Sequence, residues 1–188
     1  MTEPRAEVIF ELLEHEYPDA VCELDYRTAW QLLVATVLSA QCTDKRVNSV
    51  TPELFRRFPS PVEMARATRE ELEKLIRPTG FHRNKARNLQ ETARRLLCDH
   101  GGEVPRDLEA LIALPGVGRK TAKVVLGEAF GIPAGIAVDT HVRRLANRIG
   151  LSAAGDPETV AGDLESAVSR EGWIDFSKRL ILHGRRIC

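Results

Sequence analysis

The sequence predicts an all-α fold, and three of its features lead to this expectation. Apolar residues recur three and four positions apart along most of the chain, which is the spacing of a helix face. No segment alternates apolar and polar residues for long enough to predict a strand. The segments between the expected helices are short, so the 188 residues are expected to form a compact fold.

The expected helices of the N-terminal half are marked by apolar stripes and by capping patterns. Ser60 with Glu63, and Thr68 with Glu71, match the capping box, in which a hydroxyl and a glutamate satisfy the first backbone N–H groups of a helix. Thr28 is a candidate cap for the apolar helix that follows it. The stripes cover residues 8–13 (Val8, Ile9, Leu12 and Leu13), 28–40, 47–55, 72–76 and 89–97.

The C-terminal half continues the helical pattern. A short helix over residues 108–112 is expected to break at Leu114-Pro115-Gly116, and the next helix covers residues 119–130. Asp139 and Asp156 each precede an apolar stripe in the position of a helix cap. The last helix is expected over residues 176–184.

The composition excludes several classes of protein. Hydrophobic residues make up 43% of the chain, enough for a core and too many for a disordered chain. The longest dense apolar stretch, residues 30–38, is too short to span a bilayer, and no secretory signal is visible at the N-terminus. No CxxC pair occurs among the cysteines, which are therefore expected to be reduced thiols in the cytoplasm: Cys22, Cys42, Cys98 and Cys188.

The charges are unevenly distributed although the formal net charge is zero. Residues 1–30 hold two basic and eight acidic residues, a net charge of −6, and the other 158 residues hold 25 basic and 19 acidic, a net charge of +6. Any one basic run could be a solvated helix face or a contact to phosphate. The basic runs fall within residues 83–87, 94–95, 119–123, 143–148 and 178–186.

The most informative segment is LPGVGRKTA at residues 114–122. Gly116 and Gly118 permit a tight turn that opens directly into a helix, whose first N–H groups form a ready anion site. The segment is neither a P-loop, because Arg119 separates Gly118 from Lys120, nor a dinucleotide fingerprint, because no strand precedes it. A plain helix–hairpin–helix corner is the structural alternative.

Lys120 and Asp139 are the candidate reactive residues. Lys120 stands at a helix start beside Arg119 and Lys123, where the charged ammonium is disfavoured, so it is expected either to contact phosphate or to react as a neutral amine. Asp139 is expected to cap a helix, to supply a carboxylate to the chemistry, or to do both.

These motifs resemble those of the endonuclease III family of helix–hairpin–helix DNA glycosylase/AP lyases. The match comprises LPGVGRKTA at 114–122, VDTHV at 138–142 and LSAQCTD at 38–44. The resemblance implies a two-lobed fold, with a six-helix barrel over residues 24–133 and a second lobe from residues 1–23 and 134–188. It also implies a monomer that binds double-stranded DNA, excises oxidised pyrimidines, and cleaves the abasic site by β-elimination through a lysine Schiff base.

The resemblance also assigns roles to individual residues. Lys120 matches the nucleophile and Asp139 the catalytic carboxylate. Gln41 matches the residue that fills the gap left by the flipped nucleotide, and Phe81 matches a wedge beside the opposite base. Taken alone, Gln41 could be a helix C-terminal residue and Phe81 a core aromatic. The remaining expected DNA contacts are Leu114, Gly116, Gly118, Arg119 and His141.

The family usually carries a [4Fe–4S] cluster on four cysteines spaced C-x6-C-x2-C-x5-C. Here Cys188 matches only the first of these ligands and is the last residue of the sequence. One thiolate cannot hold such a cluster, so the chain as given is expected to lack it, with truncation favoured over a version that dispenses with the cluster.

Three other functions remain as alternatives. A monofunctional adenine glycosylase of the same superfamily is disfavoured, because Thr36 stands where its catalytic glutamate is expected and Lys120 is present. A pyrimidine-dimer glycosylase shares the motifs. A non-catalytic DNA-binding module needs the glycines and basic residues but has no use for Lys120 with Asp139.

Overall fold

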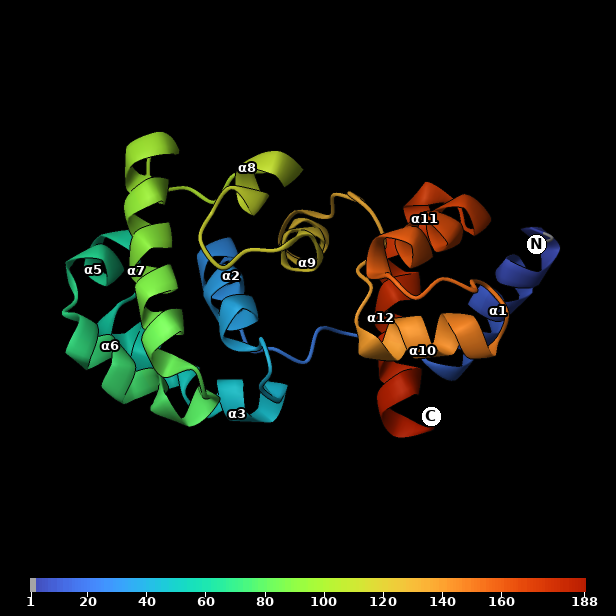
Figure 1. Ribbon diagram of the computed structural model, residues 1–188, viewed down its shortest axis with the longest axis horizontal. Coiled ribbons are helices and arrows are strands. Elements are labelled where there is room, and N and C mark those ends of the chain that lie inside the picture. The colour runs from blue at the N-terminus through green and yellow to red at the C-terminus, as the bar shows by residue number, and fades with distance from the viewer. Residues whose placement is uncertain (1–2) are drawn as a thin grey trace. The chain divides into compact units, whose positions relative to one another are not determined.

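The computed structural model describes residues 3–188, with side chains from residue 6 onward, and all regular structure within that range is helical. The prediction of an all-α fold is therefore confirmed. The helices, drawn in Figure 1, are α1 (Glu3–Glu16), α2 (Ala29–Leu38), α3 (Asp44–Asn48), α4 (Thr51–Arg57), α5 (Pro61–Arg66), α6 (Arg69–Ile76), η1 (Arg77–Thr79), α7 (His82–Asp99), α8 (Leu108–Ile112), α9 (Arg119–Phe130), α10 (Thr140–Arg148), α11 (Pro157–Ala167), η2 (Arg170–Gly172) and α12 (Trp173–Arg186).

The chain forms two compact units. We call Glu23–Phe130 the hairpin unit, because it contains the segment 114–122. The terminal unit combines the described residues up to Cys22 with Gly131–Cys188. Each unit has its own buried apolar residues, and each is described by itself below.

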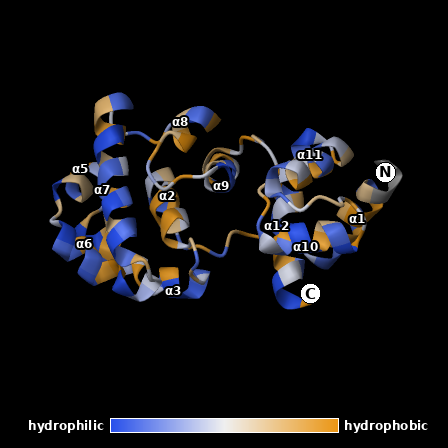
Figure 2. Cartoon of the chain, in the orientation of Figure 1, coloured by the Kyte–Doolittle hydropathy of each residue, from blue (hydrophilic) through white to orange (hydrophobic). Residues whose placement is uncertain are grey.

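The long helix α7 organises the hairpin unit. It packs on α5 and α6 along one side and on α2 along another, and α2 in turn packs on α9 (Figure 1). Almost every residue of α2 is buried, and Figure 2 accordingly shows orange and pale residues around much of this helix. Figure 2 also shows blue and orange residues side by side along α7, as expected of a helix that covers a core with one face.

The terminal unit is built around α12. This helix packs against α10 and α1, while α11 packs against α1 and α10. Phe176 of α12 is fully buried, and its ring meets that of Phe10 edge-on with centroids 5.7 Å apart. The same core contains Leu13 and Tyr17 from the N-terminal segment, which fixes α1 to the C-terminal helices.

The capping patterns predicted from the sequence are confirmed. Both capping boxes form at the starts of α5 and α6, where each hydroxyl accepts a backbone N–H and each glutamate accepts the N–H of the cap residue. Thr28 caps α2 through an acceptor bond from the backbone N–H of Gln31, 3.2 Å away.

Two details of the sequence prediction are wrong. The stripe over residues 47–55 is not one helix but two, α3 and α4, because Pro52 has no N–H to donate to the carbonyl of Asn48 and its ring clashes with a continuing helix. In α1, only Leu13 of the expected stripe is buried, whereas Val8 and Leu12 are 53% and 63% exposed. The face of α1 that contacts the core is narrower than the positions of its apolar residues predict.

Candidate active site

The segment 114–122 forms a tight hairpin between α8 and α9. The backbone N–H of Val117 donates to the carbonyl of Leu114 at 3.1 Å, and Gly116 lies within this turn at φ +78°. Leu114 and Val117 are buried and anchor the turn, while Gly116 and Gly118 are exposed. The expected contact residue Leu114 therefore serves first as an anchor of the hairpin.

Side chains of α7 brace this hairpin from one side. The hydroxyl of Thr92 donates to the carbonyl of Pro115 at 3.0 Å, and the guanidinium of Arg95 donates to the carbonyl of Ala113 at 2.9 Å. Asn88 lies directly against Gly116, so closely that a side chain at that glycine would collide with it. The turn is thus held in place by a helix that is distant from it in sequence.

Lys120 lies in the first turn of α9 and is exposed. The helix hydrogen-bond pattern begins with the N–H of Ala122, which donates to the carbonyl of Gly118 at 2.9 Å. The preceding N–H groups of α9 have no acceptor one turn earlier in the helix, so they present positive partial charge beside Lys120. Arg119 forms an exposed 3.4 Å ion pair with Glu109 of α8, an interaction that solvent keeps weak and that an anion could displace.

Asp139 is the cap of α10, as the sequence predicts. One carboxylate oxygen, Oδ1, accepts the backbone N–H of His141 at 2.8 Å and that of Val142 at 2.9 Å. The residue is half-buried and follows the buried run Ile136–Val138. These bonds fix the orientation of the carboxylate, which is a requirement for a catalytic group as much as for a cap.

His141 contacts Arg144, which in turn is fixed to the backbone of α12. Its Nδ1 lies 3.2 Å from Nη2 of Arg144, and the same Nη2 donates to the carbonyl of Gly184 at 2.9 Å. Gly184 leaves the space that His141 fills, since a Cβ at that glycine would lie 2.8 Å from Cβ of His141. The expected DNA contact at His141 is therefore rigidly supported, although the residue is only half-exposed.

Gln41 and Phe81 share an unusual backbone conformation. Their φ angles are +53° and +47°, and they are the only non-glycine residues with positive φ among those that the structure describes. Side chains of this size seldom adopt that region, which costs on the order of 1–3 kcal/mol and occurs most often at functional sites. Gln41 lies in a turn beyond the end of α2, and Phe81 is 66% exposed, so neither the helix-end nor the core interpretation describes them.

Three cations that the sequence grouped into basic runs are buried. Lys85 and Arg179 are 5% and 6% exposed, and Lys123 is 9% exposed. Arg179 donates to Glu14 at 3.0 Å and lies over the ring of Phe10, so it links α12 to α1. These three side chains therefore fit neither interpretation of the basic runs, as solvated helix faces or as phosphate contacts.

The sequence did contain a signal for the buried cation of α7. Lys85 lies four residues before Leu89, seven before Thr92 and eleven before Leu96, which places it on the apolar face. Thr92, which is not among the predicted site residues, is a polar residue on that same face and is fully buried. A polar residue in register with an apolar stripe predicts a buried partner.

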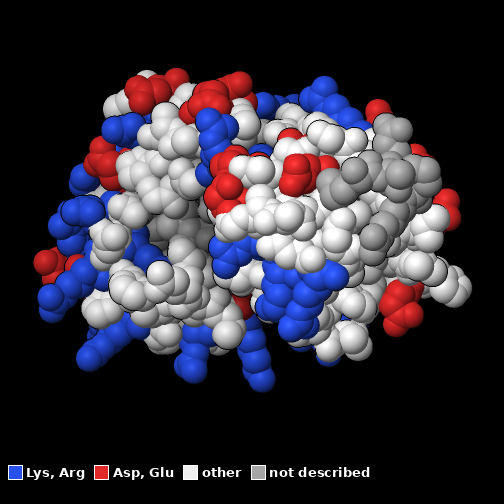
Figure 3. Space-filling model, turned by 45° about the vertical axis from the view of Figure 1, so that its right-hand side comes forward, with Lys and Arg blue, Asp and Glu red and all other residues white. Residues whose placement is uncertain are grey.

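Charged side chains of both signs lie on the visible surface. Figure 3 shows clusters of Lys and Arg side chains on the visible face, together with clusters of Asp and Glu.

No helix within the described range is both long and apolar enough to cross a bilayer.

Cys188 lies beside two arginines and is exposed. Loss of solvation raises the pKa of its thiol, but hydrogen bonds from Arg144 and Arg148 outweigh this, so the pKa lies below its ordinary value. Nη1 of Arg148 is 2.7 Å from Sγ. A thiolate is the form that binds metal. However, residues 3–188 include no group of three or more Cys, His, Asp or Glu side chains placed to hold a metal. The described residues do not fit a four-thiolate cluster.

Known proteins are similar in sequence to this chain over most of its length. Residues 34–170 match the model of the HhH-GPD superfamily base excision DNA repair proteins. The endonuclease III of Synechocystis sp. is 53% identical over 184 residues, which cover 98% of this chain and 84% of that protein.

Two solved structures of endonuclease III with DNA match the whole fold. A non-covalent complex has a TM-score of 0.96 and 44% identity, and the match covers 100% of this chain and 88% of that one. A trapped covalent intermediate has a TM-score of 0.94 and 44% identity, and the match covers 98% of this chain and 87% of that one.

Proposed function

The chain belongs to the endonuclease III family of HhH-GPD base excision DNA repair proteins, and we propose that Lys120 and Asp139 carry its glycosylase and AP lyase chemistry on oxidised pyrimidines. The observation that supports this most strongly is the placement of Lys120. The amine-bearing side chain of Lys120 starts from the first turn of α9, directly after the glycine turn whose backbone N–H groups suit a phosphate. A purely binding hairpin does not require that amine.

The proposed reaction begins at C1′ of the damaged nucleotide. The neutral amine of Lys120 forms a bond to C1′ as the bond from C1′ to the base breaks, and the base leaves with a proton. The sugar ring then opens and leaves an imine between C1′ and Nζ of Lys120. Loss of a proton from C2′ expels the 3′ phosphate, which cleaves the strand by β-elimination.

Asp139 is proposed to assist at the charged stages of this sequence. Its carboxylate either stabilises the cationic sugar or moves the protons that the amine and C2′ lose. The two cap bonds to Oδ1 hold the group in a fixed direction, so that it need not reorganise during the reaction.

Gln41 and Phe81 are proposed to enter the DNA when the damaged nucleotide is flipped out. Unstacking a base costs a few kcal/mol, and inserted side chains restore part of the lost contact. Both residues are exposed and both occupy strained turns of the hairpin unit. Gly116, Gly118, Arg119 and His141 are proposed to contact the phosphates and sugars around the lesion, and the protein is proposed to act as a cytoplasmic monomer.

The experiment that tests this function compares three duplex substrates of the same sequence. One contains thymine glycol, one a pyrimidine dimer, and one adenine opposite 8-oxoguanine. The proposal predicts base release and strand cleavage on the first substrate. Cleavage of the dimer alone, adenine release without cleavage, or binding without any reaction would each support one of the alternative functions instead.

A further inference from the structure

Lys85 joins two turns of the hairpin unit that are far apart in sequence. Its Nζ donates to the carbonyl of Leu38 and to the carbonyl of Thr79, each at 2.8 Å. Leu38 is the last residue of α2, and Thr79 is the last residue of η1. A single buried ammonium therefore ties the end of α2 to the loop that leads into α7.

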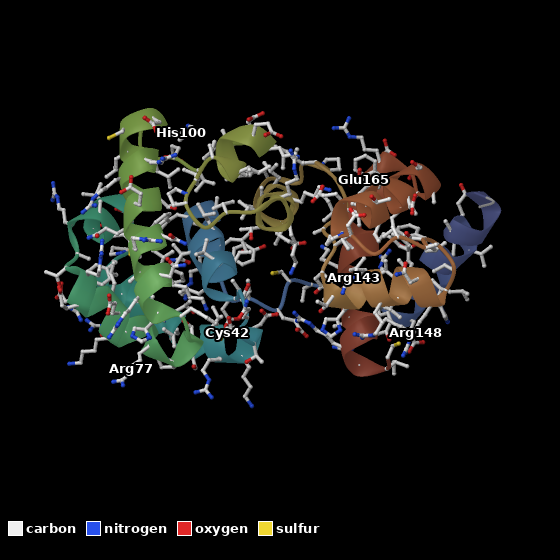
Figure 4. All side chains as sticks on the ribbon, in the orientation of Figure 1. Cys42, Arg77, His100, Arg143, Arg148 and Glu165 are labelled. Atoms are coloured by element: carbon white, nitrogen blue, oxygen red, sulfur yellow. The ribbon has the colours of Figure 1, made fainter. Side chains whose placement is uncertain are left out.

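These two turns are the ones that carry Gln41 and Phe81. Gln41 follows Leu38 by three residues, and Phe81 follows Thr79 by two. In Figure 4 the labelled residues Cys42 and Arg77 mark the two segments, and both segments lie near the end of α7 where that helix begins. Contacts between α3 and η1, and between η1 and α7, place them side by side.

Lys85 is unusual because it is a charged side chain that is buried. Burying a charge is costly unless it is compensated, and burial here lowers the pKa of the ammonium, while the nearby Cys42 acts in the opposite direction. The two carbonyls compensate as charge-assisted acceptors, and the one on Leu38 lies at the negative end of the α2 helix dipole. An apolar residue would fill the same space without this cost, but it could not link the two carbonyls.

We propose that Lys85 is a positioning residue that holds the Gln41 and Phe81 turns in one fixed arrangement, so that both side chains are prepared to enter DNA together. This inference rests on the insertion roles proposed above for Gln41 and Phe81. If each turn had to become ordered during binding, the entropy of ordering would be subtracted from the energy available for unstacking. Lys85 reduces that loss because the arrangement exists before DNA binds.

The test replaces Lys85 by Met, which keeps the length of the side chain but removes the charge and both hydrogen bonds. Gln90→Met is the matched control. Gln90 is also buried on α7, and it donates one hydrogen bond, of 2.7 Å, to the carbonyl of Ala67, in a segment away from Gln41 and Phe81. All measurements are made well below the unfolding midpoint of the least stable variant. If Lys85→Met does not fold, Lys85→Gln, which keeps a hydrogen-bond donor, is used in its place.

Two measurements distinguish a positioning role of Lys85 from a general loss of stability. The first is the ratio of kcat/KM for strand cleavage at an abasic site in duplex DNA to that in single-stranded DNA, where no base pair has to be opened. The second is the fluorescence of 2-aminopurine placed opposite a tetrahydrofuran abasic analogue, at saturating protein. Lys85→Met is expected to lower the duplex to single-strand ratio about tenfold or more and to reduce the fluorescence rise, because misplaced side chains no longer offset unstacking. Gln90→Met is expected to leave both readouts unchanged.

The same substitutions are then made in a Gln41→Ala/Phe81→Ala background. If Lys85 acts through these two side chains, adding Lys85→Met is expected to lower the ratio no further. An effect of Lys85→Met equal to that of Gln90→Met, or one that persists in full in the double-alanine background, would overturn the inference. If Gln41→Ala/Phe81→Ala by itself leaves the ratio and the fluorescence unchanged, the insertion roles are wrong, and the proposed function has failed at that point instead.

Discussion

Asn88 of α7 lies so close to Gly116 that a Cβ built on the glycine would be 2.6 Å from Nδ2 of the asparagine. The glycine also has φ +78°, a conformation that other residues seldom adopt. Two independent constraints therefore require glycine at this position. Together with the bonds from Thr92 and Arg95, this contact sets the hairpin against α7.

We expect Gly116→Ala to weaken binding to abasic-site DNA and to lower the free energy of unfolding. Holding alanine at positive φ costs about 1–3 kcal/mol, and the collision with Asn88 destabilises the folded state further. Equilibrium denaturation and a binding titration measure the two effects. Gly162→Ala is the control, because that glycine lies within α11 with open space around its Cβ position. It is expected to stabilise the protein by about 0.5–1 kcal/mol. A Gly116→Ala protein as stable as the wild type would contradict the account of the turn.

Asp139→Asn is expected to lower turnover by roughly 10²-fold, in the range of a lost acid–base or charge-stabilising group, while stability changes little because Asn caps helices about as well as Asp. Single-turnover kinetics and thermal unfolding measure the two quantities. Asp156→Asn provides the control, since Asp156 caps α11 by accepting the N–H of Thr159 at 2.8 Å and has no proposed part in the reaction. A turnover in Asp139→Asn like that of the control would show that Asp139 is only a cap.

DNA affinity is expected to fall steeply with salt although the net charge is zero. About five or six phosphate contacts correspond to a slope near −5 in a plot of log K against log salt concentration, at about −0.9 per contact. A fluorescence anisotropy titration over a series of salt concentrations measures the slope. A flat response would mean that the exposed basic residues are ordinary solvated groups.

Stability is expected to fall in acid partly because of the capping glutamates. The hydrogen bond from the Ser60 hydroxyl lowers the pKa of Glu63, and the backbone N–H of Thr68 lowers that of Glu71. A carboxylate whose pKa is lower in the folded state contributes stability above its unfolded pKa and loses that contribution as the pH falls through the folded one.

The variant Glu63→Gln/Glu71→Gln removes this dependence, because glutamine serves in a capping box without titrating. Its free energy of unfolding is expected to change less than that of the wild type between about pH 5 and pH 3. Urea unfolding at several pH values measures the difference, with Glu73→Gln on α6 as the control. Equal slopes for the wild type and the double variant would contradict the assignment.

The sequence predicts the local features of this fold better than the tertiary ones. The caps at Ser60, Thr68 and Asp139 were predictable because each depends on residues within three positions of one another. The glycine turn at Gly116 was predictable for the same reason. The break between α3 and α4 also has a local cause in Pro52, but the apolar stripe that runs across it masks this signal.

Features that depend on contacts between residues far apart in the sequence were harder to predict from the sequence. The apolar stripe of α7 indicates that Lys85 is buried, but its acceptors, the carbonyls of Leu38 and Thr79, are too far away in the sequence to be predicted from it. Likewise, the positive φ angles of Gln41 and Phe81 belong to turns that are held by this tertiary contact, so the sequence pointed to these residues only through the resemblance to a family.

Borohydride trapping tests the central claim most directly, because it reports the imine on the attacking amine. The protein is mixed with DNA that contains thymine glycol and reduced with sodium borohydride, and the adduct is located by peptide mapping. The account predicts a stable covalent complex attached at Lys120, and no complex with Lys120→Ala, which still binds damaged DNA through the hairpin. A complex that persists in Lys120→Ala, or an adduct on another residue of the wild-type protein, would contradict it.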